Sequence, residues 1–239
     1  MNKFVKVGSM ALAIAMSVPA FAQEAEVEEE EGAIGWTPVA LSLWSPVQVP
    51  WGSARWDVFG LDIGILWADN PKMYGLGVSG LAMATRDDMG GLQVSGLCNW
   101  ATRDVYGMRV TVGANITFGD TYGMEAGLFG YREGEFWGWD TNFIGSYSDK
   151  DLWGVGVAGI LNLNMAQTYG ATIAIGGNMA KVAYGLQLGA IFNFTDELHG
   201  FQIGLVNFAR TCPWGLQIGL VNVIMDNQLK VLPLVNFYF

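Results

Sequence analysis

The stretch at residues 215–222 reads GLQIGLVN, and it nearly repeats GFQIGLVN at 200–207 and GLQLGAIFN at 185–193. The glycine that opens each copy recurs through most of the chain, in steps of 15 or 16 residues, at positions 60, 75, 91, 107, 123, 138, 154, 170, 185, 200 and 215. A fixed period of this kind indicates that one small structural unit is used many times over, so it governs how every local motif is interpreted.

Within each unit, apolar and polar residues alternate. The first and third residues after the opening glycine are apolar in nearly every unit, and the fourth is small or an asparagine. This period of two predicts a β-strand of about ten residues with one apolar face. Polar segments at 68–73, 84–90 and 147–152 are the predicted turns. The second position is mostly polar, and its polar members are Asp62, Gln93, Arg109, Glu125, Asp140, Thr172, Gln187, Gln202 and Gln217.

Equivalent positions of successive repeats are called a column here. Two further columns carry recurring residue types. Asparagines recur eight residues after the glycine, at Asn99, Asn115, Asn162, Asn178 and Asn193, and are predicted to form turns and hydrogen-bond networks. An aromatic residue precedes the glycine in most units, and its parity places it on the apolar face, next to the turns. Amphipathic rings at such a position are typical of a membrane–water interface and predict an aromatic girdle. The girdle residues are Phe59, Tyr74, Tyr106, Tyr122, Trp137, Trp153, Tyr169, Tyr184 and Trp214.

The leading prediction is an all-β fold, a transmembrane antiparallel β-barrel of about 12 strands, with 14 as the upper alternative. Apolar columns would face lipid, and the polar second column would line a lumen, where Arg109 and Glu125 could pair. Counting every candidate strand gives an odd number, whereas bacterial single-chain barrels are even, so the segment 38–46 is predicted to lie outside the wall. The alternative is a β-solenoid in which leucines point inward and glutamines face water.

The two ends of the chain carry their own signals. Residues 1–22 combine Lys3 and Lys6, an apolar run and Ala20-Phe21-Ala22, which predicts a signal peptide cleaved after Ala22. The acidic residues 23–35 are predicted to be a disordered tail, and residues 36–239 a single repeat domain. The ending VLPLVNFYF at 231–239 resembles the last strand of bacterial outer-membrane barrels, in which Phe237 and Phe239 would be read by the insertion machinery. Pro233 cannot donate to a strand ladder and predicts a bulge.

The repeats GLQIGLVN, together with WTPVALSLWSPVQ (36–48) and FGLDIGIL (59–66), resemble the leptospiral-type surface-repeat-containing proteins of bacteria. The resemblance covers roughly residues 36–239 and is weakest in the middle units, such as GMEAGLFGY (123–131). It implies an envelope location and supplies no activity to carry over.

Little in the chain points to catalysis. The single histidine, His199, occupies the aromatic column, where it is interpreted as a polar substitute for a ring. GLGVSG at 75–80 matches a dinucleotide fingerprint, but its glycines belong to the repeat and no helix follows. No Cys/His spacing predicts a metal site. Cys98 and Cys212 could pair in an oxidising compartment, and the net charge of −10 gives no sign of nucleic-acid binding.

The sequence therefore predicts an exported, non-enzymatic outer-membrane protein without a cofactor, structural or simply pore-forming, in contact with the lipid bilayer and the barrel-insertion machinery. Two alternatives stay open. One is a soluble or surface-attached β-solenoid that acts as an interaction protein. The other is a lipid-modifying barrel enzyme that depends on His199.

Overall fold

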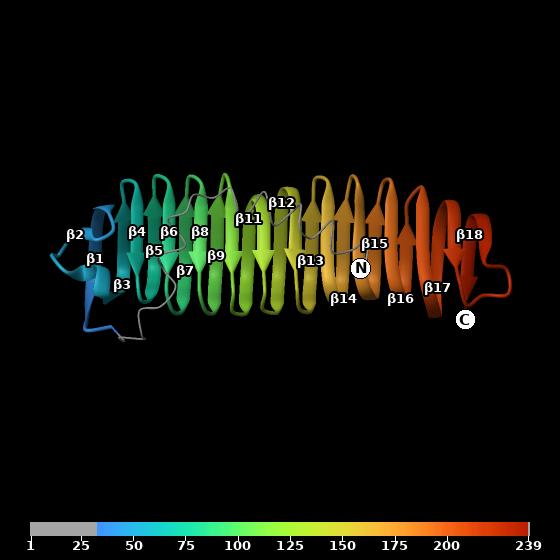
Figure 1. Ribbon diagram of the computed structural model, residues 1–239, viewed down its shortest axis with the longest axis horizontal. Coiled ribbons are helices and arrows are strands. Elements are labelled where there is room, and N and C mark those ends of the chain that lie inside the picture. The colour runs from blue at the N-terminus through green and yellow to red at the C-terminus, as the bar shows by residue number, and fades with distance from the viewer. Residues whose placement is uncertain (1–32, 239) are drawn as a thin grey trace, which may run out of the picture.

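The computed structural model describes residues 33–238 and shows a β-solenoid of about ten turns (Figure 1). Each turn contributes to two facing parallel layers, here called the first and second sheets, which the bent strands join into one 18-stranded sheet. The first sheet contains β1 (Gly35–Trp44), β3 (Trp56–Gly64), β5 (Met73–Ser79), β7 (Met89–Ser95), β9 (Val105–Thr111) and β13 (Leu152–Ala158). The second contains β4 (Trp67–Asn70), β6 (Ala82–Thr85), β8 (Cys98–Ala101) and β10 (Ala114–Thr117).

The remaining long strands bend from one sheet into the other. These are β11 (Thr121–Arg132), β12 (Phe136–Ser148), β14 (Leu161–Ala174), β15 (Gly177–Gly189), β16 (Phe192–Ile203) and β17 (Val206–Ile224). Their pairing is parallel and in register, so that Gln187 lies beside Gln202 and Gln202 lies beside Gln217. Equivalent positions of successive repeats therefore stack into columns that run along the solenoid axis.

The predicted closed antiparallel barrel is wrong, and the solenoid alternative describes the fold. Each predicted ten-residue strand contains a corner that the alternation did not reveal. Between β3 and β4, for example, the corner is Ile65 and Leu66, directly after the small residue Gly64. The chain therefore turns inside each repeat as well as between repeats, and a strand pairs with its equivalent one repeat away instead of with a hairpin partner.

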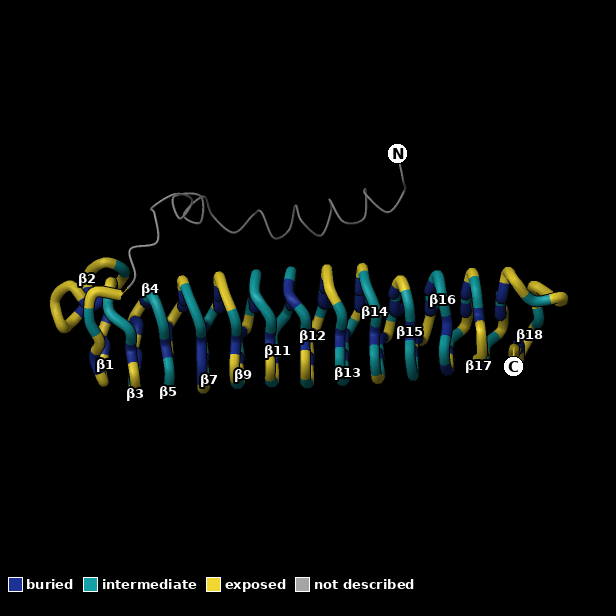
Figure 2. The backbone as a smooth tube through the Cα atoms, turned by 90° about the horizontal axis from the view of Figure 1, so that it is seen from below, coloured by how far each residue is buried: buried dark blue, intermediate teal, exposed yellow. Residues whose placement is uncertain are grey.

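The side chains are arranged in the opposite sense to the predicted solenoid. Among the described residues, buried polar and charged residues outnumber buried hydrophobic ones, and the large hydrophobic residues are mostly exposed. Figure 2 shows buried, intermediate and exposed stretches along the turns of the solenoid. The second column after the glycine points inward, whereas the apolar first and third columns lie outside.

The two ends of the solenoid are covered by irregular strands. The segment 38–46 was predicted to lie outside the sheet, but β1 pairs in parallel with β3, so that prediction is wrong. Next to it lie β2 (Val47–Val49), which pairs with β1, and a short 3-10 helix, η2 (Ser53–Arg55). Because β1 continues the parallel stack beyond β3, the N-terminal edge belongs to the sheet itself.

At the other end, β18 (Val231–Tyr238) runs antiparallel to β17. The register shifts between Gly219 and Asn222, opposite Leu234 and Leu232, so the pairing is irregular opposite Pro233, but the extra residue lies on β17 and not at the proline. Phe237 is exposed on this strand. Phe239, the signal peptide and nearly all of the acidic tail lie outside the described residues.

The opening glycine of each repeat permits the close stacking of the turns. From Gly60 to Gly200 these glycines have φ between +108° and +148°, a backbone region that L-residues rarely adopt. A Cβ on Gly154 would overlap the carbonyl oxygen of Gly138 in the preceding turn. Any side chain at this column would therefore force neighbouring turns apart.

We expect Gly154→Ala to destabilise the protein by at least about 2 kcal/mol, because it combines backbone strain with a clash against main chain. Gly156→Ala is the matched control on the same strand, since its Cβ would first meet Leu152 at 3.5 Å, an ordinary contact. Denaturant unfolding measures both variants. Equal midpoints for the two would contradict the role given to the glycine column.

Candidate functional site: a polar interior and an apolar outer surface

All nine residues predicted to line a lumen are buried in the solenoid interior. Residues 33–238 form a solenoid and not a closed barrel wall, so these side chains fill a core instead of lining a pore. Three of them, Gln187, Gln202 and Gln217, form a ladder in which Gln217 donates to Gln202 and Gln202 donates to Gln187. The Gln202 Nε2–Gln187 Oε1 distance is 2.7 Å, and the Gln217 Nε2–Gln202 Oε1 distance is 2.8 Å.

An asparagine ladder runs along the second sheet. The side-chain amides of Asn162, Asn178, Asn193, Asn207 and Asn222 are joined in sequence by hydrogen bonds of 2.8–2.9 Å. A separate step joins Asn99 to Asn115 at 3.0 Å. The prediction that asparagines build a network is confirmed, but they lie within strands and not in turns. Asn207 and Asn222 were missed because their units are one residue shorter, which moves them to the seventh position after the glycine.

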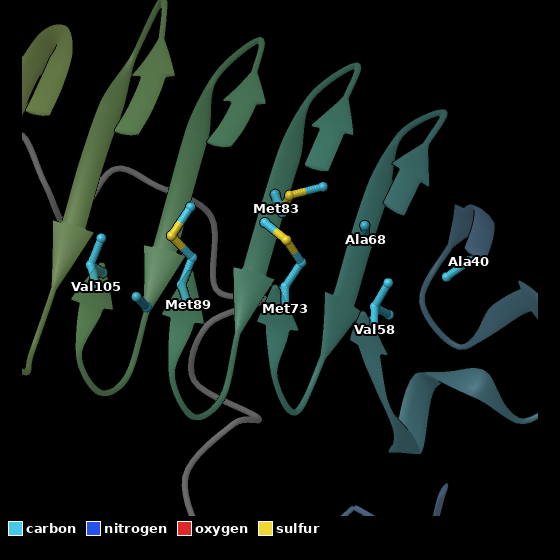
Figure 3. Close-up of a cluster of buried hydrophobic side chains, with 8 residues drawn as sticks. Ala40, Val58, Ala68, Met73, Met83, Met89 and Val105 are labelled. Atoms are coloured by element: carbon cyan, nitrogen blue, oxygen red, sulfur yellow. The ribbon is translucent and has the colours of Figure 1, made fainter. Parts of the chain in front are cut away.

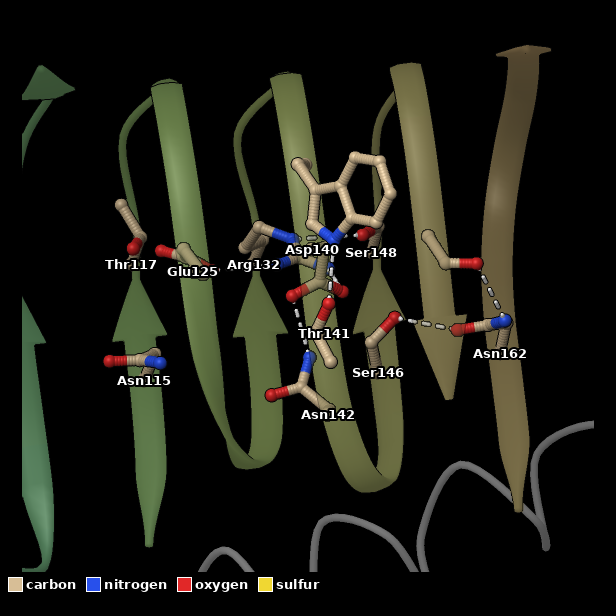
Figure 4. A network of polar contacts seen from close by, with 12 residues as sticks. Asn115, Thr117, Glu125, Arg132, Asp140, Thr141, Asn142, Ser146, Ser148 and Asn162 are labelled. Atoms are coloured by element: carbon tan, nitrogen blue, oxygen red, sulfur yellow. Dashed lines mark hydrogen bonds and ion pairs between the residues drawn. The ribbon is translucent and has the colours of Figure 1, made fainter. Parts of the chain in front are cut away.

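Near the middle of the solenoid, four buried charges form one network, and Figure 4 shows three of them, Glu125, Arg132 and Asp140. Glu125 accepts from Nε of Arg109 at 3.1 Å and from Arg132 at 2.6 Å, and Arg132 also reaches Asp140 at 2.7 Å. The possible pair between Arg109 and Glu125 is therefore confirmed. Arg132 comes from the second sheet and was not singled out in the sequence, because the corner that aims it inward was not recognised.

The network is electrically neutral, with two guanidinium groups and two carboxylates, and every charge has a partner. Asp140 also accepts from Asn142 at 2.6 Å, and Arg109 donates to the carbonyl oxygen of Ile116 at 3.1 Å. Burial opposes ionisation of Glu125, but the adjacent guanidinium groups of Arg109 and Arg132 hold its pKa below the usual value. Burial likewise disfavours the charged form of Arg132, yet Asp140 and Glu125 raise its pKa overall.

We expect Glu125→Ala to lower the free energy of unfolding by about 3–5 kcal/mol, because it leaves two buried guanidinium groups short of negative charge. Glu133→Ala removes the same side chain from a partly exposed position directly after β11 and should have little effect. Chemical denaturation followed by circular dichroism compares the two. A loss confined to Glu133→Ala, or no loss in either variant, would show that the network does not hold the core together.

Asp62 is buried near the N-terminal end of the solenoid and forms no ion pair with any residue in 33–238. Its Oδ2 accepts from Nδ2 of Asn70 at 2.7 Å, and its Oδ1 has no hydrogen-bond partner among the described residues. Burial raises the pKa of Asp62 to about 7, with a smaller contribution from the nearby charge of Asp69 and a partial offset by the hydrogen bond from Asn70. The carboxyl group is therefore favoured in its protonated form inside the fold.

Because the folded-state pKa of Asp62 is raised, its stabilising contribution is complete below pH of about 4 and is lost as the pH rises through about 7. We expect the free energy of unfolding to fall by about 3 kcal/mol between pH 5 and pH 8 on account of this group. Asp62→Asn should remove that part of the pH dependence, which urea titrations at the two pH values measure. An identical pH dependence in the variant would refute the assignment.

Apolar side chains occupy the two ends of the interior. Near the N-terminus, Figure 3 shows Val58, Met73, Met89 and Val105 in one inward column of the first sheet, with Met83 opposite. A second cluster contains Ala180, Ala183, Leu198, Ala209, Cys212 and Ile224. The core is thus mixed, because both apolar clusters share their repeats with buried polar residues, such as Asp62 in the first and Gln202 in the second.

The outer surface of both sheets is apolar. On the first sheet the outward columns include Leu76, Met108, Met124, Phe201 and Ile218, all exposed. On the second sheet they include Trp100, Tyr131, Phe194 and Phe208, which are partly exposed. The sheets meet at the corners, whose residues are also hydrophobic. We call this side the apolar edge, formed by Ile65, Leu66, Leu81, Leu97, Val112, Phe143, Ile160, Ile175, Ile191, Leu205 and Leu220.

Charged residues gather on the opposite side. Between residues 58 and 224, every charged side chain is either in the interior network, at Asp62, or in or beside the turns that lead from the second sheet back to the first. We call these turns the charged edge. It includes ion pairs such as Arg86–Asp69 at 3.2 Å and Arg103–Asp87 at 3.1 Å.

The predicted girdle residues all lie on the outer face of the first sheet, in one column beside the charged edge. Their rings stack along the axis, with centroids 4.6 Å apart for Trp137 and Trp153 and 3.8 Å apart for Trp153 and Tyr169. Tyr169 continues the stack to Tyr184 at 4.7 Å. Because ring faces cover one another, the column presents mainly ring edges outward and offers no broad platform for stacking a ligand.

His199 continues this stack, with its ring 4.4 Å from that of Tyr184. Its Nε2 lies 2.5 Å from the Glu197 carboxylate on the charged edge. The histidine therefore occupies an aromatic position, as its place in the column predicted. Cys98 and Cys212 are free thiols, so the pairing that the sequence left open does not occur in this structure. Burial raises the pKa of Cys98 to about 11 and that of Cys212 to about 12.

Comparisons with protein-family models, with curated proteins and with solved structures find no match for this chain. Within residues 33–238 no cluster of His, Cys, Asp and Glu could hold a metal ion. The described part of the chain also contains no helix long and apolar enough to cross a membrane. The distribution of polar and apolar side chains is therefore the observation on which a functional proposal rests.

Proposed function

We propose that this is a non-enzymatic protein of the bacterial envelope that works by contact, with the outer surface of its β-solenoid as the interaction surface. The observation that carries the proposal is the apolar exterior, which extends over both sheets and the apolar edge. Monomeric proteins rarely expose contiguous apolar patches larger than a few hundred Å², and larger patches mark interaction sites.

The interior supports a structural role for the polar residues. Within each of the glutamine and asparagine ladders, successive amides hydrogen-bond to one another, and the four-charge network is neutral and buried, so these groups are committed to the fold. Export by residues 1–22, an outer-membrane location and recognition of Phe237 by the insertion machinery stay predictions. The stacked column around His199 gives no specific support to the lipid-modifying enzyme, since the hydrogen bond of His199 runs to a surface glutamate.

The proposal is tested by placing charges on the apolar edge. In cells that export the full chain, we expect Leu97→Glu/Ile160→Glu/Leu205→Glu to shift the protein from the envelope fraction to the aqueous fraction. Each of these residues is exposed, so the core ladders stay intact. Fractionation of lysed cells, with circular dichroism of the purified protein as the check on folding, measures the shift.

The matched control carries the same number of new glutamates on the charged edge, as Arg103→Glu/Lys150→Glu/Lys181→Glu, and should stay with the envelope. A folded apolar-edge variant that remains in the envelope fraction as fully as the control would contradict the proposal.

A further inference from the structure

The solenoid is amphipathic across its width. Three contiguous sides, namely the outer faces of the two sheets and the apolar edge that joins them, are hydrophobic. The fourth side is the charged edge. On the apolar edge, Val112, Phe143 and Ile175 are 69–75% exposed, although an ordinary protein would bury such residues. In cross-section the solenoid therefore has three hydrophobic sides and one charged side that faces water. We call this amphipathic cross-section the wedge.

On the outer faces of both sheets, aromatic residues lie at the boundary between the apolar surface and the charged edge. On the first sheet, Tyr106 donates to Asp104 at 3.4 Å and Trp137 Nε1 donates to Glu135 at 3.2 Å. On the second sheet, the hydroxyls of Tyr131 and Tyr147 donate to Glu133 at 2.9 Å and to Asp149 at 2.5 Å, respectively. In each case the polar atom is turned toward the charged edge, and the ring body rests on the apolar face.

We propose that the apolar edge inserts into one leaflet of a lipid membrane, with the solenoid axis in the membrane plane and the charged edge in water. This inference rests on the proposed function and names its partner. Rings with one polar atom favour the headgroup region, where Trp and Tyr are enriched in membrane proteins. The two aromatic bands therefore define the depth at which the wedge would sit.

The dimensions of the wedge fit a single leaflet. From Trp137 in the aromatic column to Phe143 on the apolar edge the chain advances six residues, or about 20 Å at roughly 3.3 Å per residue. The hydrocarbon core of a bilayer is about 30 Å thick, so one leaflet supplies about 15 Å before the headgroups begin. An inserted apolar edge would end near the bilayer midplane while the aromatic rings stay at the interface.

A lipid layer covers this surface better than a protein does. A second copy packed face to face would cover one sheet and leave the other sheet and the apolar edge in water. Acyl chains, being fluid, can surround all three sides at once. The backbone of the inserted part is paired within the solenoid, so the turns bring few unsatisfied polar groups into the lipid.

The sign of the charge on the charged edge distinguishes insertion of the apolar edge from electrostatic adsorption to a membrane. The turns of the charged edge hold more Asp and Glu than Lys and Arg, as in Arg86-Asp87-Asp88 and Asp149-Lys150-Asp151. Anionic headgroups would repel such an edge, whereas polybasic segments bind them. Binding should therefore occur on zwitterionic lipid and persist at high salt.

The experiment uses the full purified chain with Cys98→Ala and Cys212→Ala, a single added cysteine carrying an environment-sensitive dye, and vesicles of phosphatidylcholine. With Leu97→Cys, on the apolar edge, we expect co-flotation in about 1 M salt, a blue-shifted emission, and strong quenching by lipids brominated deep in the acyl chain. With Lys150→Cys, on the charged edge, we expect co-flotation without lipid quenching and ready quenching by aqueous iodide.

Three results would overturn the inference. Equal iodide access at both positions would exclude insertion by the apolar edge. Binding restricted to anionic vesicles and lost in salt would make the contact electrostatic. Failure to float, with the dye at Leu97→Cys protected only at high protein concentration, would indicate a second copy as the occupant.

The proposed function can hold even if the purified protein does not bind lipid vesicles. Suppose that glutamates on the apolar edge release the protein from the envelope, but the unmodified purified chain does not bind lipid vesicles. The apolar edge is then an interaction surface, and its partner is a protein. If neither release nor vesicle binding is seen, the proposed function fails as well.

Discussion

The structure depends on hydrogen bonds between identical amide side chains in successive turns. A carboxamide carries both donors and an acceptor, so a glutamine or asparagine can satisfy an equal residue above it and another below. Parallel, in-register stacking at the repeat period is the arrangement that brings equal residues together at every step. The run from Asn162 to Asn222 shows the result, four consecutive amide contacts through the interior. An unpartnered amide would cost free energy once buried, so the ladder makes a polar core tolerable.

The exterior follows from the same arrangement. Since successive side chains of a strand point to opposite sides, sending Gln202 inward sends Phe201 and Ile203 outward. The hydrophobic residues that would form the core of an ordinary solenoid are therefore displaced to the surface, and only a few, such as Met73 and Leu198, remain inside. The surface so produced requires a partner, and the aromatic columns and the confinement of charge to one edge indicate which side of the molecule meets water. Fold and proposed membrane contact are thus two consequences of one alternation.

Much of this could be predicted from the residues. The glycine period located the repeat, the alternation identified strands, and the second column identified residues such as Arg109 and Gln187 that lie inside. The closure of the sheet could not be predicted, because a period of two is the same in a barrel wall and in a solenoid turn. The corner after Gly64 was hidden for a related reason, since a small residue followed by Ile65 and Leu66 continues an apolar run without a turn signal. Arg132 was missed because its inward direction depends on the equivalent corner in β11, between Gly127 and Phe129.

The distance between two widely separated parallel turns tests the central claim most directly. Spin labels at Leu76→Cys and Leu216→Cys, in a chain with Cys98→Ala and Cys212→Ala, occupy the same outward column nine repeats apart. At a strand spacing of about 4.8 Å the solenoid places their backbones about 43 Å apart, and pulsed electron paramagnetic resonance measures that separation. A distribution centred near this value would support the wound, in-register stack. A short distance, as expected when a closed barrel returns its last strands to its first, would contradict it.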